Sequence, residues 1–298
     1  MTAEKNQDAG DNAQSRRRLL MVRRGLEKFT RNRLAIIGLV VIVSIIFMCV
    51  MAPLFTAFNP TEVSLASRRQ APNSTHYFGT DSLGRDVFSR ILYGGRMSIL
   101  IALSGAAGGV FLGIVFGSAC GYFGGAGDFV TVKVSELVAA IPNLLINLVL
   151  VMIVGQSVRN LILVFTFTGW IGTFRLVRGR FFSLREESFV EACRAFGIGN
   201  LSIIFRHILP NCLGPIVVQF TLNTAGFILS EAALSFIGIG VPSGIPTWGN
   251  IMNAARDILI ITEYPWLWVF PGCTIALFVL GINFFGDGLR DILDPSQL

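Results

Sequence analysis

The feature that most constrains this chain is a series of long apolar runs that hold almost no charge. A helix needs about 20 apolar residues to cross the roughly 30 Å hydrocarbon core of a bilayer. Six runs come close to or exceed that length, and the fourth is the shortest because Arg159 and Arg175 bound its uncharged centre. We therefore expect membrane-spanning helices at about residues 34–58, 97–123, 137–155, 160–177, 210–230 and 266–285.

A seventh apolar run, at residues 232–255, contains Pro242 and Pro246 within a short stretch that is typical of a loop. Composition agrees with a membrane protein, since 53% of the residues are hydrophobic and 14% are charged, against about 25% charged in soluble domains. The expected fold class is an all-α membrane protein with six transmembrane helices. An even number of spans places both termini on the same side.

Lys and Arg are unevenly distributed among the segments between the spans, and cytoplasmic segments normally keep the excess. With the N-terminus inside, seventeen of the 24 Lys and Arg residues are cytoplasmic and seven are outside. We expect both termini to be cytoplasmic. The expected parts are then a basic cytoplasmic tail (1–33), a first transmembrane helix (34–58), an extracytoplasmic segment (59–96), and a transmembrane core (97–298) with a long cytoplasmic loop at about 184–210. The first run is too long for a cleavable signal, so we expect it to stay as an anchor.

The cysteines and the net charge argue against other classes of protein. The five cysteines lie singly, mostly in apolar runs, so neither a disulfide framework nor a zinc site is expected. The formal charge of +6 comes from residues that flank apolar runs rather than alternate with aromatic residues. Lipid is therefore the expected surroundings, and nucleic acid is not an expected partner.

Glycine recurs at every fourth position of the second run, at Gly105, Gly109, Gly113, Gly117 and Gly121. Small residues at this spacing let another helix backbone approach closely in lipid, so the stripe predicts tight helix packing. Polar groups within spans usually face the bundle interior or a watery cavity, although hydrogen bonding between helices is a common alternative. The possible translocation-path residues of this kind are Asn143, Asn147, Asn223 and Glu231, and Glu136, Asn283 and Asp287 are further polar residues in or beside spans.

The cytoplasmic loop is predicted to form two short helices with a break between them. Phe189, Ala192, Cys193 and Phe196 fall on one helical face, and Gly197 can adopt the left-handed conformation that ends a helix. Asn200 is expected to cap the second helix, whose apolar face comprises Leu201, Ile204, Phe205, Ile208 and Leu209. Patterning alone would equally allow an amphipathic connector that lies on the membrane surface.

The residues of this loop also carry a resemblance. Glu191-Ala192-Cys193, followed by Gly197 and by Ile208-Leu209-Pro210, resembles the EAA loop of binding-protein-dependent importer permeases, with Cys193 in place of the usual second alanine. In that family the loop forms a coupling helix that seats in a groove on a cytoplasmic ATPase. The resemblance implies an ATPase coupling loop that acts as a rigid lever, with Glu191, Ala192, Cys193, Gly197, Arg206 and Pro210 as its residues.

Outside the membrane, the string at residues 79–86 is by itself a turn with capping side chains. As a string it resembles the C-type permease of the oligopeptide, dipeptide and nickel uptake group. Its motif residues are Gly79, Thr80, Asp81, Gly84, Arg85 and Asp86. Further matches at residues 231–240, 247–250 and 286–295 extend the resemblance over nearly the whole chain from about Arg31. Residues 78–86 and Trp248 are candidates for an outer vestibule. Loop packing is the alternative for both, and it is the favoured interpretation of Trp248.

The resemblance implies a type I ABC importer permease fold in a bacterial inner membrane, and no enzymatic activity in this chain. It implies a heterodimer with a homologous B-type permease, two ATP-binding subunits and an extracytoplasmic solute-binding protein. The chain has no Gly-x-x-x-x-Gly-Lys-[Ser/Thr] phosphate loop, so ATP and Mg would be bound by the partner ATPases and no cofactor by this chain. The expected function is to form, with the partner permease, a translocation path for oligopeptides or dipeptides.

Three alternatives remain open at this point. A nickel or other small-solute importer of the same group would have a similar permease, because cargo choice in this group rests mainly with the solute-binding protein. A secondary transporter would be expected to show inverted repeats or paired broken helices with ion-binding carboxylates, and we find neither. A membrane-embedded enzyme would need a catalytic motif, yet the sequence holds only two histidines and no HExxH or GxSxG string.

Overall fold

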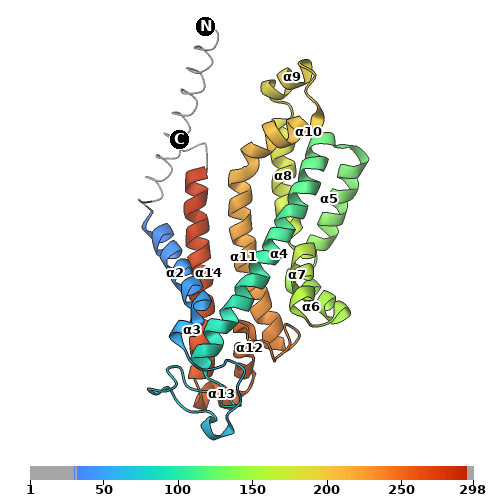
Figure 1. The fold of residues 1–298 in the computed structure, drawn as a ribbon. Coiled ribbons are helices and arrows are strands. Elements are labelled where there is room, and N and C mark those ends of the chain that lie inside the picture. The colour runs from blue at the N-terminus through green and yellow to red at the C-terminus, as the bar shows by residue number, and fades with distance from the viewer. Residues whose placement is uncertain (1–29, 31, 294–298) are drawn as a thin grey trace.

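The computed structural model describes residue 30 and residues 32–293, and its long helices run side by side as a bundle (Figure 1). The helices are α2 (Arg33–Val50), α3 (Ala52–Phe55), α4 (Val87–Phe123), α5 (Gly125–Ala139), α6 (Asn143–Val154), α7 (Val158–Thr168), α8 (Trp170–Leu184), α9 (Ser188–Ala195), α10 (Asn200–Ser202), α11 (Leu213–Ile237), α12 (Trp248–Met252), α13 (Ile258–Glu263) and α14 (Trp266–Leu293). The predicted tail at residues 1–33 lies almost entirely outside the described residues.

Within the described part of the chain, five helices or helix runs are long and apolar enough to cross a membrane, and a sixth crossing is possible if α5 and α6 form one bent span. The five are α2, α4, α7 with α8, α10 through α11, and α14. The predicted all-α class is confirmed, and the predicted six spans correspond to the upper count. Only 17% of the apolar stretch of α2 is buried, so most of that helix faces away from the rest of the chain.

The first two predicted spans are displaced from the helices that form. The first run was expected to continue to residue 58, but α2 ends at Val50 and the short α3 follows with Pro53 in its first turn. Proline suits that position because it lacks an N–H, and it disfavours a helix that passes through it. The second helix, α4, begins at Val87, ten residues before the predicted start at 97, because the Asp86 side chain accepts a hydrogen bond from the Ser89 N–H and caps it.

The third predicted span, at residues 137–155, is wrong as a continuous helix. The chain bends by 94° between α5 and α6, at residues 140–142. Pro142 accounts for the break, since its ring excludes a hydrogen bond and clashes with the carbonyl group four residues earlier. Within the hydrocarbon region of a membrane, irregular backbone is tolerated where it lines a cavity or is covered by protein.

The later spans agree better with the structure. The fourth predicted run corresponds to α7 and α8, and the sixth to α14, which continues through Pro271. The fifth continues beyond its predicted end at residue 230, as α11 reaches Ile237 and stops at Gly238, whose φ is +90°. The proline-containing stretch at residues 241–246 is a loop, as predicted.

The glycine stripe of α4 packs directly on α7 and α8, which confirms its predicted structural role. A Cβ atom on Gly105 would lie 2.6 Å from Cβ of Phe165, and one on Gly113 would lie 2.4 Å from Cβ of Thr173. Gly109, Gly117 and Gly121 meet Gly169, Val177 and Phe181 in the same way. Both sides of this contact repeat at intervals of four residues, so the backbone of α4 closely approaches those of α7 and α8 along the whole stripe.

Candidate functional site

The predicted site residues lie in three regions of the molecule, each at a different level of the bundle. Near its middle lies a groove between α6, α8 and α11, called here the central groove. At one end is the α9 loop (residues 186–210). At the opposite end, below α4 in Figure 1, residues 56–90 form a network of hydrogen bonds and ion pairs, called here the polar knot.

The central groove has a volume of about 630 Å³ and is open on one side. The bend between α5 and α6, the first half of α8 and the middle of α11 form its walls. Its lining residues are Ala139, Ile141, Pro142, Asn143, Asn147, Thr168, Gly169, Ile171, Gly172, Arg175, Gln219, Leu222, Asn223, Gly226, Phe227 and Ser230. Three of the four predicted translocation-path residues, Asn143, Asn147 and Asn223, are therefore brought together from distant parts of the sequence.

Two of these asparagines are held by hydrogen bonds to neighbouring helices. The Thr168 hydroxyl donates to Oδ1 of Asn147 at 2.9 Å. Nδ2 of Asn223 donates to the Gly169 carbonyl oxygen at 3.1 Å, while its Oδ1 accepts from Nε2 of Gln219 at 2.9 Å. The amide groups therefore have fixed orientations along the groove, as expected for a polar cavity lining within a membrane protein.

Two lining residues, Arg175 and Gln219, were not expected from the sequence. Arg175 was counted among the basic residues of the cytoplasmic side, where it only helped to set the orientation. In the structure it lies nine residues before the end of α8, so it is roughly 13 Å inside that helix end. Its position within a short apolar run was the one available signal, because a charged residue inside a span usually serves a function.

The fourth predicted path residue, Glu231, does not line the central groove. It is 0% exposed and accepts hydrogen bonds from the hydroxyl groups of Ser98 at 3.0 Å and Ser235 at 2.8 Å. Ser98 in turn accepts from the Trp248 N–H at 3.0 Å. In this chain Glu231 ties α4, α11 and α12 together.

Trp248, a vestibule candidate in the sequence, is completely buried. Its indole Nε1 donates to the Ile91 carbonyl oxygen at 3.0 Å, and its ring packs edge-on against Phe278. Trp248 therefore serves loop packing in this chain, which was the favoured interpretation.

The α9 loop projects beyond the ends of the long helices (Figure 1). As predicted, it holds two short helices separated by a break, at which Gly197 has a φ of +72°. Glu191 and Ala192 are exposed on α9, and Cys193 is partly buried. Arg206 and Pro210 are also exposed, within a π-helical turn (Ile203–Ile208) and the 3-10 turn that follows it (Leu209–Cys212).

The structure adds one detail of the loop and corrects another. The apolar face predicted for α9 is mostly exposed, since Phe196 is 85% exposed and the residue that packs inward is Val190. Because α9 projects from the bundle, only one narrow side of it meets the rest of the chain. The predicted N-cap at Asn200 is wrong: Asn200 is the first residue of α10, and its Oδ1 accepts a hydrogen bond from the Tyr122 hydroxyl at 2.9 Å.

All six residues of the motif at 79–86 lie in the polar knot. Asp81 accepts backbone hydrogen bonds from Leu83 and Arg85 and forms an ion pair with the Arg85 guanidinium at 2.7 Å. Gly79 and Gly84 have φ values of +70° and +75°, and a Cβ on Gly84 would lie 1.8 Å from the Ser64 carbonyl oxygen. Only glycine fits so close an approach with this backbone.

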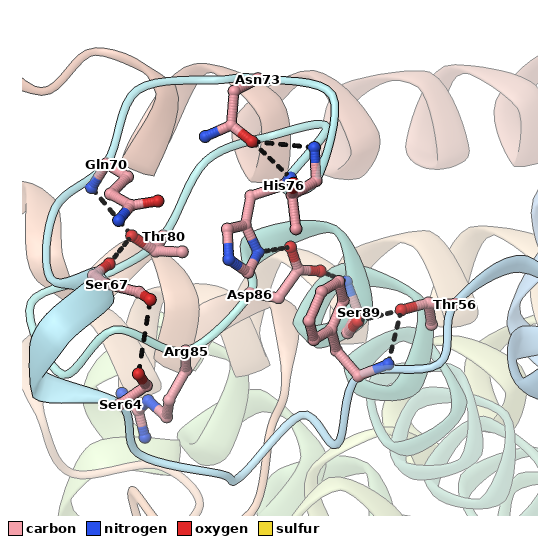
Figure 2. A network of polar contacts seen from close by, with 12 residues as sticks. Thr56, Ser64, Ser67, Gln70, Asn73, His76, Thr80, Arg85, Asp86 and Ser89 are labelled. Atoms are coloured by element: carbon pink, nitrogen blue, oxygen red, sulfur yellow. Dashed lines mark hydrogen bonds and ion pairs between the residues drawn. The ribbon is translucent and has the colours of Figure 1, made fainter.

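Asp86 is the centre of the knot, as Figure 2 shows. One carboxylate oxygen contacts Nδ1 of His76 at 2.9 Å, and the other accepts the capping hydrogen bond from Ser89. Thr80, which is fully buried, accepts from the Gln70 N–H at 2.8 Å. These contacts hold the segment between α3 and α4 against the start of α4. Within the described residues, no three His, Cys, Asp or Glu side chains lie close enough to hold a metal ion together.

Comparison with known proteins gives one consistent family. Residues 109–298 match the family described as the inner membrane component of binding-protein-dependent transport systems, and residues 21–72 match the N-terminal transmembrane domain of oligopeptide transport permease C. The chain is 40% identical to a putative peptide permease protein of Brucella suis, over 91% of this chain and 90% of the relative. It is 40% identical to the dipeptide transport system permease protein DppC of Alkalihalophilus pseudofirmus, over 92% and 90%. It is 36% identical to the oligopeptide transport system permease protein OppC of Bacillus subtilis, over 97% and 94%.

Proposed function

Because this chain belongs to the family of inner-membrane components of binding-protein-dependent transport systems, we propose that it is a permease subunit of an ABC importer for dipeptides or oligopeptides. It lies in the inner membrane and forms the translocation path together with a homologous permease. The peptide cargo is proposed from the names of its relatives, which are dipeptide and oligopeptide permeases.

The observation that carries this proposal is the central groove. It lies at the middle of the spanning helices, carries amide and guanidinium groups, and is open on one side of this single chain. A second permease at that open side would complete a closed path between the two subunits.

The α9 loop is the proposed docking element for one of two cytoplasmic ATPases. Its exposed Phe196, Glu191 and Ala192 lie on or beside a short helix that projects from the bundle. Such a lever can pass the closing motion of an ATPase to α8 and α11, to which it is joined directly. The ATPases bind ATP and Mg in this proposal, and the chain itself binds no cofactor and is not an enzyme.

The composition of the groove favours peptides over a bare metal ion as cargo. Among the described residues that line it there is no His, Cys, Asp or Glu, and its one charged side chain is Arg175. Divalent nickel is normally bound by imidazole, thiolate or carboxylate ligands, and a guanidinium group repels it. A peptide backbone, in contrast, offers carbonyl and N–H groups that match the amides of the groove.

The proposed orientation places the α9 loop and both termini in the cytoplasm, and the polar knot outside, facing the solute-binding protein. In a variant with Cys193 and Cys273 replaced by serine, a cysteine at Phe196 should react with a membrane-impermeant thiol reagent only after the membrane is opened. A cysteine at Leu65, which is 70% exposed at the other end of the molecule, should react in intact spheroplasts. The reverse pattern would overturn the orientation.

The function itself is tested with the purified protein. Solubilised membranes should yield this chain together with a second permease and two ATPases. Proteoliposomes of that complex, given the solute-binding protein and ATP on the ATPase side, should accumulate labelled dipeptide or oligopeptide. Omission of ATP is the control. Isolation of the chain without any ATPase, or peptide uptake that persists without ATP, would contradict an ABC importer.

A further inference from the structure

We infer that Arg175 binds the terminal carboxylate of the passing peptide in the central groove. This inference rests on the proposed function and deepens it, because it assigns a recognition role to one residue of the path. Three properties support it: the position of Arg175, its free hydrogen-bonding groups and the chemistry of its neighbours.

Arg175 lies inside the bundle rather than at its polar edge. It is the eighteenth of the 27 residues in the span Val158–Leu184. A charged side chain in such a position is costly in a bilayer and is retained where it faces a water-filled cavity. Arg175 meets this condition because it is exposed and lines the central groove.

The guanidinium group has donors to spare. Its hydrogen bond within the described residues runs to the Ser135 carbonyl oxygen and is long, at 3.4 Å. The charge of Glu136 interacts with that of Arg175, but the Glu136 carboxylate is already paired with Lys133 at 2.8 Å. By contrast, Arg178, about one turn further along α8, is held in a bidentate ion pair with Asp128. Of these two arginines, Arg175 is the one that can accept a new anionic partner.

The surroundings of Arg175 suit a peptide end. Gln219 lies across the groove, close to Gly172, which is on the same face of α8 as Arg175. Nε2 of Gln219 donates a hydrogen bond to Oδ1 of Asn223. Amide oxygens and N–H groups of this kind pair with a peptide backbone, while a guanidinium group pairs with a carboxylate through two parallel hydrogen bonds. Every unmodified linear peptide carries one terminal carboxylate, whatever its sequence. A single arginine can therefore recognise cargo that varies in its side chains.

The test compares one radiolabelled tripeptide as free acid and as C-terminal amide, in proteoliposomes of the full importer with saturating solute-binding protein. The measured quantity is the ratio of uptake efficiencies, acid over amide. Selection by the solute-binding protein is common to all variants, so a change in this ratio reports the permease. Arg175→Gln should lower acid uptake roughly 10- to 100-fold and leave amide uptake nearly unchanged, as expected for loss of a charge-assisted hydrogen bond.

Arg180→Gln is the matched control, because Arg180 is an exposed arginine on the same helix that does not line the groove. It should keep the wild-type ratio, and Arg175→Lys should restore part of it. An unchanged ratio in Arg175→Gln, or equal loss of acid and amide uptake, would overturn the inference. Loss of the partner permease from purified Arg175→Gln would also overturn it, since Arg175 would then serve assembly.

A second measurement tests the role of Arg175 if the solute-binding protein does not deliver the peptide amide. A tripeptide with a photoreactive group on its C-terminal residue should crosslink to α8 of the wild-type protein, and this crosslink should be lost in Arg175→Gln. Crosslinking that persists in Arg175→Gln would refute the inference. Failure of the wild-type importer to transport any peptide would instead refute the proposed function, so the two failures are distinguishable.

Discussion

Replacement of Gly197 by proline is expected to abolish peptide uptake while the subunit remains in the membrane. Gly197 has a φ of +72° and its N–H donates to the Arg194 carbonyl oxygen at 3.0 Å. Proline requires a φ near −65° and has no N–H, so both features are lost and α9 must reorient. ATP-dependent uptake of labelled peptide should fall to background, and less ATPase should co-purify.

Gly199→Ala is the matched control. Gly199 has a φ of −65°, and no heavy atom lies within 4 Å of the place that an added Cβ would take, so alanine fits there without strain. Glu191→Lys should reproduce the transport defect by another route, because it reverses a charge on the exposed side of α9. Glu263→Lys, at the opposite end of the molecule, should retain the ATPases. Wild-type uptake from both Gly197→Pro and Glu191→Lys would mean that the α9 loop is only a connector.

Gly113→Leu is expected to eliminate most of the folded protein. A Cβ at this position would lie 2.4 Å from Cβ of Thr173 and 2.8 Å from the Trp170 carbonyl oxygen. Backbone atoms cannot yield as a flexible side chain can, so α4 and α8 must separate around Gly113. Such overpacking usually costs about 1–3 kcal/mol, and more where backbone must move. Size-exclusion chromatography and thermal unfolding in detergent should show low yield and a lower Tm.

The control for this prediction is Gly179→Leu on α8, where no atom lies within 4 Å of an added Cβ. Gly179→Leu should give a normal yield and Tm. If Gly113→Leu instead assembled normally and transported a different set of peptides, the glycine stripe would belong to the translocation path rather than to helix packing.

Much of the local structure could be predicted from the sequence because its causes are local. In lipid every backbone N–H and C=O group must be paired within the chain, so a long apolar run has to form a helix wherever it crosses. The glycine stripe and the break at Gly197 were predictable for a similar reason: each depends on the size or the φ of one residue. Pro142 carried the same kind of local signal, although its place within an apolar run obscured it.

The sequence by itself therefore determined the helical class, most of the spans, the glycine contact surface and the two-part α9 loop. Only the tertiary structure decided which polar residues share a cavity. Asn143, Arg175 and Asn223 line the same groove because a 94° bend and two helix faces bring their segments together. Glu231 instead accepts a hydrogen bond from Ser98, which lies 133 residues away in the sequence. A charge count cannot separate an arginine at a helix end from one that faces a groove, because that distinction depends on which helices pack around it.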